Sequence, residues 1–239
     1  MNAIALNNNL KRNKPKGKFE MNLTIENLYN LDECYERSIF DGLQYPWEAL
    51  PKIKTFLLEF AETLPSDFER IEEFVWVGKG TTIEKTVLIK GPSIIGYNCE
   101  LRQCAFIREN VILGNEVTIG NSTELKNSLL FNRVQVPHFN YVGDSILGYK
   151  SHLGAGVICS NLKSNGTSVN VKAGEDCIET GLRKFGAMVG DNSEVGCNSV
   201  LNPGTVIGRN SIVYPLTPVR GCVPENHILK NNGELVARR

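Results

Sequence analysis

The chain has 239 residues with 26 basic and 26 acidic side chains, so it carries no formal net charge. This length suits one large domain or two small ones, and the charge balance gives no general electrostatic attraction to nucleic acid. Seven cysteines are scattered without a C-x-x-C pair. That argues against a disulfide framework or a zinc knuckle and favours reduced thiols in a cytoplasmic protein. No metal is expected, and no apolar run reaches membrane-spanning length.

The chain begins with a basic segment and continues with a helical one. Residues 2–18 are rich in asparagine and lysine and contain no acidic side chain, so residues 1–20 are predicted to be a disordered tail. Over residues 21–74 apolar residues follow helical spacing, with a first helix expected from Leu28 to Tyr35 and a second from Ile53 to Leu64. Pro51 suits the first turn of the second helix.

We expect this helical segment to cap the open first coil of the repeat that follows it, because the ends of a solenoid expose its core. Trp47 lies in the middle of the segment, in the run Tyr-Pro-Trp-Glu-Ala-Leu-Pro. Large aromatic side chains are usually packing anchors, so Trp47 is interpreted as an anchor between the helices and the repeat. A ligand platform is the alternative.

A six-residue period dominates the next part of the chain. A large apolar residue returns at every sixth position, namely at Val77, Ile83, Ile89, Ile95, Leu101, Ile107, Leu113, Ile119, Leu125 and Phe131. Six residues along an α-helix turn the side chain away, whereas in extended chain they keep it on one side. The series resumes at Leu147 and Leu153, and again from Val189 to Val219. The pattern therefore predicts a tandem repeat of short strands with two interruptions.

Gly often follows the repeating residue and Asn often lies three positions after it. Both tolerate the left-handed backbone conformations that tight corners need. Short strands separated by such corners wind into a three-sided prism in which three hexads, or eighteen residues, make one coil. The expected fold is mainly β, a parallel β-helix over residues 75–222 with a small N-terminal helical cap. We expect loops at 132–146 and 160–188, and a tail at 223–239 that forms a short helix or cap.

Residues eighteen apart should stack on one face of the prism at about 4.8 Å. Lys90, Arg108 and Lys126 form such a stack, each directly after a repeating apolar residue. Like charges in register are unfavourable unless something offsets them, and a bound phosphate or phosphosugar would do so. The alternative is that the three cations extend into water or pair with neighbouring glutamates.

The two interruptions of the repeat are candidate functional loops. The first, between Phe131 and Leu147, contains His138, one of three histidines in the chain. Loops held by a rigid scaffold often carry catalytic residues, although a lone loop histidine is also frequently inert. The second interruption, from Asn161 to Gly186, is polar and is expected to form an arm that reaches a neighbouring subunit.

One set of residues in the repeat carries a resemblance to a known family. The run that carries it consists of Arg108, Glu124-Leu-Lys126, His138-Phe-Asn-Tyr141-Val-Gly-Asp144, Gly154-Ala155-Gly156 and Asn161. It resembles, in residue type and spacing, the acetyltransferase domain of the bacterial bifunctional enzyme that makes UDP-N-acetylglucosamine. It is also similar to the corresponding domain of the archaeal sugar-1-phosphate nucleotidylyltransferase/acetyltransferases. These are hexapeptide-repeat acyltransferases, so the resemblance implies a left-handed β-helix, an exception to the right-handed crossover rule; a right-handed solenoid is the alternative.

The resemblance implies acetyl transfer from acetyl-CoA to the amine of glucosamine 1-phosphate or galactosamine 1-phosphate, in UDP-N-acetylglucosamine biosynthesis. It also implies a homotrimer with sites between subunits. Imidazole suits the role of general base because its unperturbed pKa lies near neutrality. The resemblance implies that the general base is His138. It implies that the substrate is bound by Arg108, Lys126, Tyr141 and Asn161, and that acetyl-CoA is bound by Ala155 and Ala187.

The sequence also departs from this family. Thr167 stands where relatives often place a lysine, which Lys163 or Lys172 could replace, and His152 stands where the bacterial enzyme has an asparagine. No nucleotide-binding glycine loop is recognised, so nucleotidyl transfer is not expected. Two alternatives remain open. One is an acyltransferase for a nucleotide-linked amino sugar, and the other is a catalytically silent trimeric scaffold that binds sugar phosphate.

Overall fold

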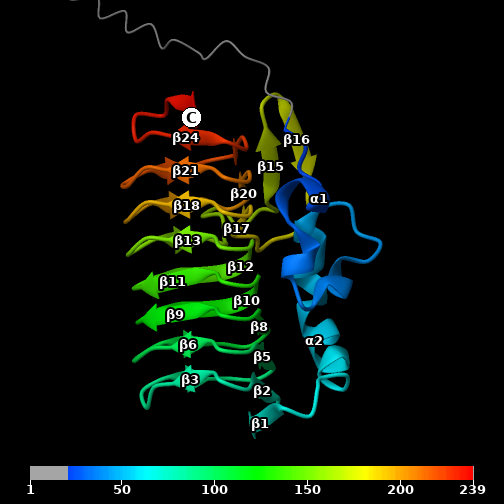
Figure 1. Ribbon diagram of the computed structural model, residues 1–239. Helices are drawn as coiled ribbons and strands as arrows, with labels where there is room; N and C mark the ends of the chain where they lie inside the picture. Colours follow the sequence, from blue (N-terminus) through cyan, green and yellow to red (C-terminus); the bar gives the residue numbers. More distant parts are fainter. Residues whose placement is uncertain (1–20, 239) are drawn as a thin grey trace, which may run out of the picture.

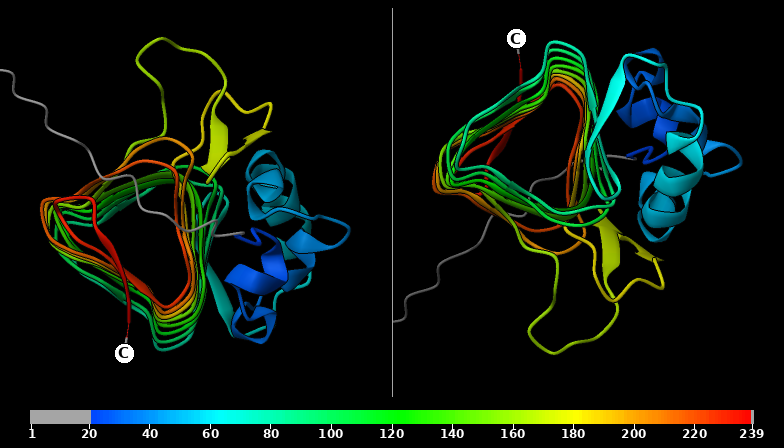
Figure 2. Two further views of the ribbon diagram at one scale, coloured as in Figure 1. Left: turned by 90° about the horizontal axis from the view of Figure 1, so that it is seen from above. Right: turned by 90° about the horizontal axis from the view of Figure 1, so that it is seen from below.

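The computed structural model describes residues 21–238. The tail predicted for residues 1–20 lies outside the described residues. A three-sided prism of short parallel strands makes up most of the molecule, and the helices lie along one flank of it (Figure 1, Figure 2). None of the helices in residues 21–238 is long and apolar enough to cross a membrane.

Each coil of the prism places one strand on each of three faces. The first face contains β2 (Val75–Gly78), β5 (Ser93–Ile95), β8 (Val111–Leu113), the second halves of β10 (Glu124–Leu130) and β12 (Tyr141–Leu147), β17 (Ala187–Val189), β20 (Thr205–Ile207) and β23 (Cys222–Val223). The second face contains β3 (Thr82–Ile83), β6 (Glu100–Leu101), β9 (Thr118–Asn121), β11 (Gln135–His138), β13 (His152–Leu153), β18 (Glu194–Val195), β21 (Ile212–Val213) and β24 (His227–Leu229). The third face contains β4 (Leu88–Ile89), β7 (Phe106–Ile107), the first halves of β10 and β12, β14 (Ile158–Cys159), β19 (Val200–Leu201) and β22 (Pro218–Val219).

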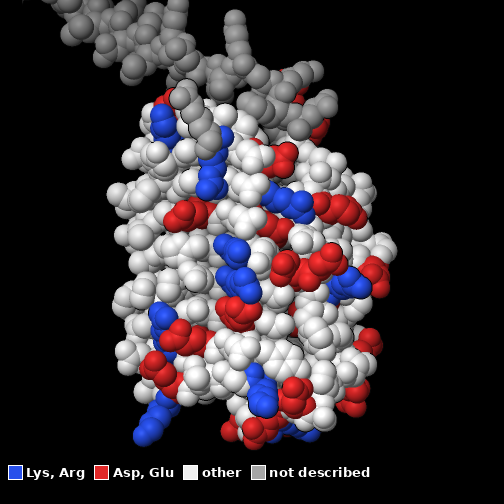
Figure 3. Space-filling model, viewed as in Figure 1, with Lys and Arg blue, Asp and Glu red and all other residues white. Residues whose placement is uncertain are grey.

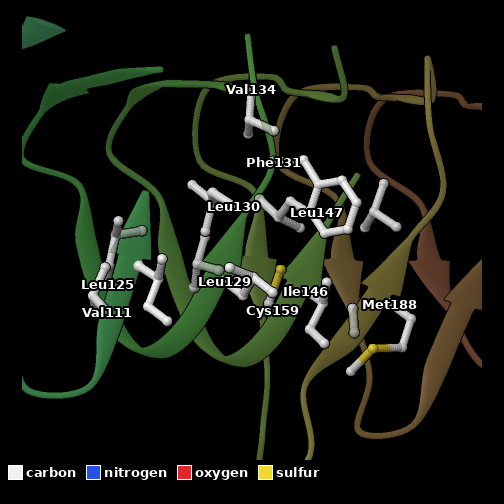
Figure 4. Packing of buried hydrophobic residues seen from close by; sticks show 14 of the residues in the cluster. Val111, Leu125, Leu129, Leu130, Phe131, Val134, Ile146, Leu147, Cys159 and Met188 are labelled. Atoms are coloured by element: carbon white, nitrogen blue, oxygen red, sulfur yellow. The ribbon is translucent and has the colours of Figure 1, made fainter. Parts of the chain in front are cut away.

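The coil is left-handed, as the resemblance implied. On the near side of Figure 1 the strands of the second face point to the left while the chain climbs from β3 to β24. The repeating apolar residues fill the interior, and Leu101, Ile107 and Leu113 have no exposed surface. On the opposite side of the first face, the side chains of Leu129, Ile146 and Met188, each directly before an interior residue, form a second row across consecutive coils (Figure 4). The six-residue period therefore predicted the fold class correctly.

The loop predicted for residues 132–146 is wrong, because the chain stays in the prism there as β11 and β12. Leu130 pairs in register with Leu113 and with Leu147, so successive coils here have seventeen residues in place of eighteen. The corner between the third and first faces is the part of these coils that is one residue shorter. Asn127 and Asp144 occupy that corner in left-handed conformations, with φ values of 47° and 46°. The break in the hexad is thus a shortened corner.

Phe131 is likewise not the interior residue that the six-residue series predicted. Leu130 takes that place, and Phe131 follows it at the corner between the first and second faces. The ring of Phe131 packs against Tyr29 and Phe40, with ring centroids 4.9 Å and 6.0 Å away. It therefore anchors the N-terminal segment to the prism.

The N-terminal segment is helical but lies elsewhere than predicted. It consists of α1 (Ile25–Leu28), the 3₁₀ helices η1 (Leu31–Glu33), η2 (Arg37–Phe40) and η3 (Pro46–Lys52), and α2 (Ile53–Ala61). The first expected helix is thus broken into short turns, and the second is confirmed from Ile53 to Ala61. The segment packs on the flank formed by the first face and does not cover the open first coil, where Ile83 is 37 % exposed (Figure 2). The prediction of an end cap is wrong because aromatic contacts hold the segment to the flank. Within residues 21–238, the strand that adds to the open side of the first coil is β1 (Phe68–Glu72), which runs antiparallel to β2.

The second interruption does leave the prism, as predicted. The chain departs from the third face after β14 and returns at β17 on the first face, so the excursion ends just before Ala187. It contains a hairpin of β15 (Asn170–Ala173) and β16 (Asp176–Glu179), which lies near β20 and β23 of the same chain (Figure 1). Val169 and Val171 are fully buried there. Contact of this arm with a neighbouring subunit stays a prediction.

The C-terminal tail forms strands, and the short helix considered for it is wrong. β24 continues the second face by pairing with β21, and β25 (Leu235–Ala237) folds back antiparallel to β24. The coil therefore extends beyond residue 222 to Leu229, and the returning strand covers its last edge.

Candidate active site

The candidate site lies on the third face, where strand register sets outward side chains in columns. Ile107, Leu125, Val142 and Cys159 pair in series across four coils. The residues that follow them form one column, and the residues that precede them form a second column beside it. The first column runs through Lys90, Arg108, Lys126, Gly143 and Ser160, and the second through Phe106, Glu124, Tyr141 and Ile158.

The two predicted phosphate-binding cations are neighbours in the first column. Nη1 of Arg108 lies 2.9 Å from Oε1 of Glu124, and Nζ of Lys126 lies 4.0 Å from Oε1 of Glu109. The hydrogen bond to Glu124 raises the pKa of Arg108, so its guanidinium stays charged. Glutamates thus offset the repulsion of the stacked cations, as the alternative interpretation expected. The Arg108 side chain nevertheless remains 34 % exposed and can contact an anion.

Tyr141 and Asn161 come together above this cation pair. Nδ2 of Asn161 donates to the hydroxyl of Tyr141 at 3.3 Å and also to the carboxylate of Asp144. Burial raises the pKa of Tyr141, and the negative charge of Asp144 adds to that shift, so the phenol remains a neutral hydroxyl. A Cβ at Gly143 would lie 2.6 Å from the Tyr141 hydroxyl, so the absence of a side chain there lets the tyrosine cross the column.

His138 lies at the corner that joins the second face to the third. Its N–H donates to Oδ1 of Asn140 at 3.1 Å, and its carbonyl accepts from the N–H of Gly156 at 3.0 Å. Ala155 holds the equivalent position on the next coil, as the pairing of β11 with β13 requires. The side chain of His138 is exposed, and no residue in 21–238 makes a side-chain hydrogen bond or ion pair with its ring. His138 and Ala155 thus form a second group of predicted site residues, which lies three residues before Tyr141 on one coil and three residues before Ile158 on the next.

The other predicted or suspected site residues lie apart from these two groups. Ala187 has no exposed surface, and its N–H donates to Oγ of Ser145 on the first face. Thr167 bonds Asn165 within the arm. His152 is on the second face, with Nδ1 3.7 Å from Oε1 of Glu194. The described chain therefore brings Ala187 to neither His138 nor the cation pair.

Three further residues contact the candidate site residues and were given no site role from the sequence: Glu124, which was considered only as an ion-pair partner, Asp144 and Asn127. Nδ2 of Asn127 donates to Oδ1 of Asp144 at 2.9 Å, so both oxygens of this buried carboxylate accept hydrogen bonds. One signal could have revealed this link. Asn110, Asn127, Asp144 and Asn161 recur every seventeen residues, whereas a search at eighteen does not align them.

The surface around the prism has no dominant charge on the side drawn in Figure 3, where basic and acidic side chains are interspersed. Within residues 21–238, no group of three or more His, Cys, Asp or Glu side chains is arranged to hold a metal ion. The cysteines are all free thiols.

Comparison with known proteins finds one family model and several relatives that match the sequence. The family model "GMPPB C-terminal domain" matches residues 89–180. The chain is 27 % identical over 233 residues to the bifunctional protein GlmU of Methanococcus vannielii, which covers 94 % of this chain and 55 % of the relative. It is 32 % identical over 151 residues to the bifunctional sugar-1-phosphate nucleotidylyltransferase/acetyltransferase of Sulfurisphaera tokodaii, covering 56 % of this chain and 38 % of the relative. The chain spans about half the length of the GlmU relatives that it matches.

Among solved structures, perosamine N-acetyltransferase from Caulobacter crescentus, bound to CoA and GDP-perosamine, aligns with a TM-score of 0.40 and 15 % identity. That alignment covers 66 % of this chain and 56 % of the other. The repeat and the sequence matches define the class to which the chain is related, the hexapeptide-repeat acetyltransferases. Within that class its relatives are the GlmU-type bifunctional proteins, which confirms the resemblance found in the sequence.

Proposed function

We propose that this protein is an N-acetyltransferase that moves the acetyl group of acetyl-CoA to the amine of an amino-sugar phosphate. Glucosamine 1-phosphate and galactosamine 1-phosphate are the simplest acceptors. The observation that carries the proposal is the placement of Arg108 and Lys126 beside the Tyr141–Asn161 pair. Two cations suit a phosphate, and a fixed hydroxyl and amide suit the hydroxyl groups of a sugar.

His138 supplies the general base in this proposal. The amine nitrogen attacks the thioester carbonyl, a C–N bond forms, and the C–S bond breaks to release CoA. His138 accepts the proton that the amine loses, and the departing thiolate takes up a proton to leave as the thiol. The ring of His138 is exposed, so its nitrogens are accessible to a bound amine. Such a base typically contributes 10²–10⁴-fold, and positioning of the two substrates must supply much of the remainder.

The thioester end of acetyl-CoA is assigned to the corner beside His138. Ala155 lies one coil further on, and its small side chain leaves room for the acetyl group. Phe139, next to His138, is 61 % exposed, and Leu216, three coils further along the same edge of the prism, is 68 % exposed. Two such exposed apolar side chains suit contact with a second chain, so we propose a homotrimer in which a neighbouring subunit completes the site. A mass equal to one chain by light scattering would contradict that assembly.

One observation favours a second acceptor class, a nucleotide-linked amino sugar. Lys90 continues the column of Arg108 and Lys126 by one coil, with its Nζ 5.4 Å from the centre of the Phe106 ring. Three cations in line match a diphosphate better than a single phosphate does. Loss of Lys90 should therefore matter for a nucleotide-linked acceptor and hardly at all for a 1-phosphate.

The experiment is a CoA-thiol release assay with acetyl-CoA and a panel of acceptors. The panel holds glucosamine 1-phosphate, galactosamine 1-phosphate, their UDP-linked forms, and free glucosamine. We expect turnover of a phosphorylated amino sugar and none of free glucosamine. Binding of a sugar phosphate without turnover of any acceptor would support the silent scaffold and refute catalysis. Preference for the UDP-linked forms would select the second acceptor class.

A further inference from the structure

A chain of hydrogen bonds joins the N-terminal segment to the candidate site. The carbonyl of Leu50, in η3, accepts from Nδ2 of Asn127 at 3.3 Å. The same amide donates to Oδ1 of Asp144, whose other oxygen accepts from Nδ2 of Asn161. Nδ2 of Asn161 also donates to the hydroxyl of Tyr141. The chain thus runs from the helical segment to the pair proposed to bind the sugar.

An apolar contact makes a second, independent connection from η3 to Asn161. The ring of Trp47 lies 5.8 Å from that of Phe185, and both residues are almost fully buried. The N–H of Phe185 donates to the carbonyl of Asn161 at 3.0 Å, and the N–H of Gly186 donates to the carbonyl of Asp144 at 2.8 Å. Phe185 is where the arm rejoins the prism. The helical segment therefore holds Asn161 through both its side chain and its backbone.

These contacts fix the orientation of the Asn161 amide. A primary amide has two N–H donors, and Asn161 directs both bonds of Nδ2 to protein oxygens, those of Tyr141 and Asp144. Its Oδ1 is then the group left to accept a hydrogen bond from a ligand hydroxyl. Asp144 is 5 % exposed, so its carboxylate depends on its two amide partners, because an unpaired buried charge is costly. Loss of Asn127 would leave Asp144 with one partner fewer and free the Asn161 amide to turn.

We propose that η3 (Pro46–Lys52) is a positioning element for the acceptor-binding pair Tyr141–Asn161, acting through Asn127 and Asp144 and through the Trp47–Phe185 contact. The inference rests on the proposed function, since it concerns the same site. It assigns a role to the N-terminal helical segment, which lies outside the prism.

The kinetic test uses the full chain and the variant Asn127→Gly. Glycine accepts the left-handed backbone of this corner, so the substitution removes the side chain with little backbone strain. We expect the acceptor KM to rise about tenfold while kcat and the KM for acetyl-CoA stay within about twofold. Asn110→Gly is the matched control, at the same corner one coil earlier with φ 63° and no hydrogen bond to the site. An unchanged acceptor KM in Asn127→Gly, or an equal rise in the control, overturns the proposal.

The second test does not depend on activity. Amide hydrogen exchange is followed in the parent, in Asn127→Gly, and in Trp47→Leu with Trp47→Phe as the conservative variant. We expect faster exchange at the Phe185 and Gly186 amides in Asn127→Gly and Trp47→Leu, near-parent exchange in Trp47→Phe, and unchanged exchange at interior amides of the prism. Unchanged exchange at Phe185 and Gly186 in both disruptive variants overturns the link. If the parent acetylates no acceptor but the two disruptive variants still exchange faster than the parent at Phe185 and Gly186, the proposed function is refuted and the link is retained.

Discussion

The guanidinium of Arg108 is held 2.9 Å from the carboxylate of Glu124, on the neighbouring strand of the third face. The central cation of the proposed phosphate site therefore already has an acidic partner within the protein, with which a bound anion would have to compete. Such a pair is worth little at an exposed surface, because water and salt screen it. A phosphate with two negative charges can compete for the same donors, since Arg binds phosphate in a bidentate manner.

Replacing Arg108 by Ala should raise the KM for a phosphorylated acceptor by about 10- to 100-fold, because a hydrogen bond to a charged group contributes about 1.5–3 kcal/mol. The KM for acetyl-CoA should stay near the parent value. Steady-state kinetics with each substrate varied in turn measures both constants. Arg133→Ala is the control, since Arg133 pairs with Glu116 at another corner of the prism. Equal effects of the two substitutions on the acceptor KM would remove Arg108 from the site.

Replacing His138 by Ala should lower kcat by about 10²–10⁴-fold with small changes in both KM values, because a general base acts in the transition state. Rapid-quench or thiol-release kinetics at saturating substrates measures kcat. His152→Ala should retain parent activity, since His152 lies on the second face beside Glu194. A variant without His138 that keeps full kcat would show that another group, or water, takes the proton.

A buried acid in the N-terminal segment should make stability depend on pH. Glu36 has no exposed surface, its Oε1 has no hydrogen-bond partner within residues 21–238, and burial raises the pKa of its carboxyl from 4.5 to about 8. The folded chain therefore binds this proton more tightly than the unfolded chain does. The free energy of unfolding should fall as pH rises from about 4.5 to about 8, by on the order of a few kcal/mol.

Urea unfolding at several pH values checks this dependence. Glu36→Gln, which resembles the protonated acid, should flatten the slope between pH 5 and 8, whereas the exposed Glu62→Gln should leave it as in the parent. A parent whose unfolding free energy is constant over this range would show that Glu36 is solvated or paired in solution.

The interior of the prism could be predicted from the sequence because one rule governs it. A side chain six residues along an extended chain returns to the same side, so Leu101 and Ile107 were assigned to the core from spacing alone. The shortened corner could not be found that way. Leu129, Leu130 and Phe131 are all apolar, so the sequence still shows an apolar residue at the next sixth position, Phe131. The change of register to Leu130, which is the interior residue, is therefore hidden.

The same limit applies to the candidate site. Arg108 and Lys126 are one full eighteen-residue coil apart, so the repeat alone placed them side by side. The link from Leu50 to Asn161 depends on a corner that is one residue short and on side-chain hydrogen bonds between distant segments. The position of the helical segment also depends on tertiary contacts, such as Tyr29 on Phe131, that local spacing does not encode.

A glycine next to the Tyr141–Asn161 pair gives the most local test of the proposed site. A Cβ at Gly143 would lie 2.6 Å from the hydroxyl of Tyr141 and 2.7 Å from Nδ2 of Asn161. Both atoms are ends of side chains, so Gly143→Ala should displace them and leave the prism folded. We expect the acceptor KM to rise about tenfold, as for the loss of one or two hydrogen bonds, with the thermal midpoint of unfolding little changed.

Gly120→Ala gives the contrasting case, because a Cβ there would meet the backbone carbonyl of Pro137 at 1.6 Å, and backbone cannot move aside so easily. That variant should unfold at a clearly lower temperature, since overpacking costs about 1–3 kcal/mol or more. Circular dichroism melts and acceptor kinetics on both variants separate the two effects. If Gly143→Ala keeps the parent KM, Tyr141 and Asn161 do not contact the acceptor. If it melts as early as Gly120→Ala, Gly143 is needed by the prism itself, and the loss of binding would follow from misfolding.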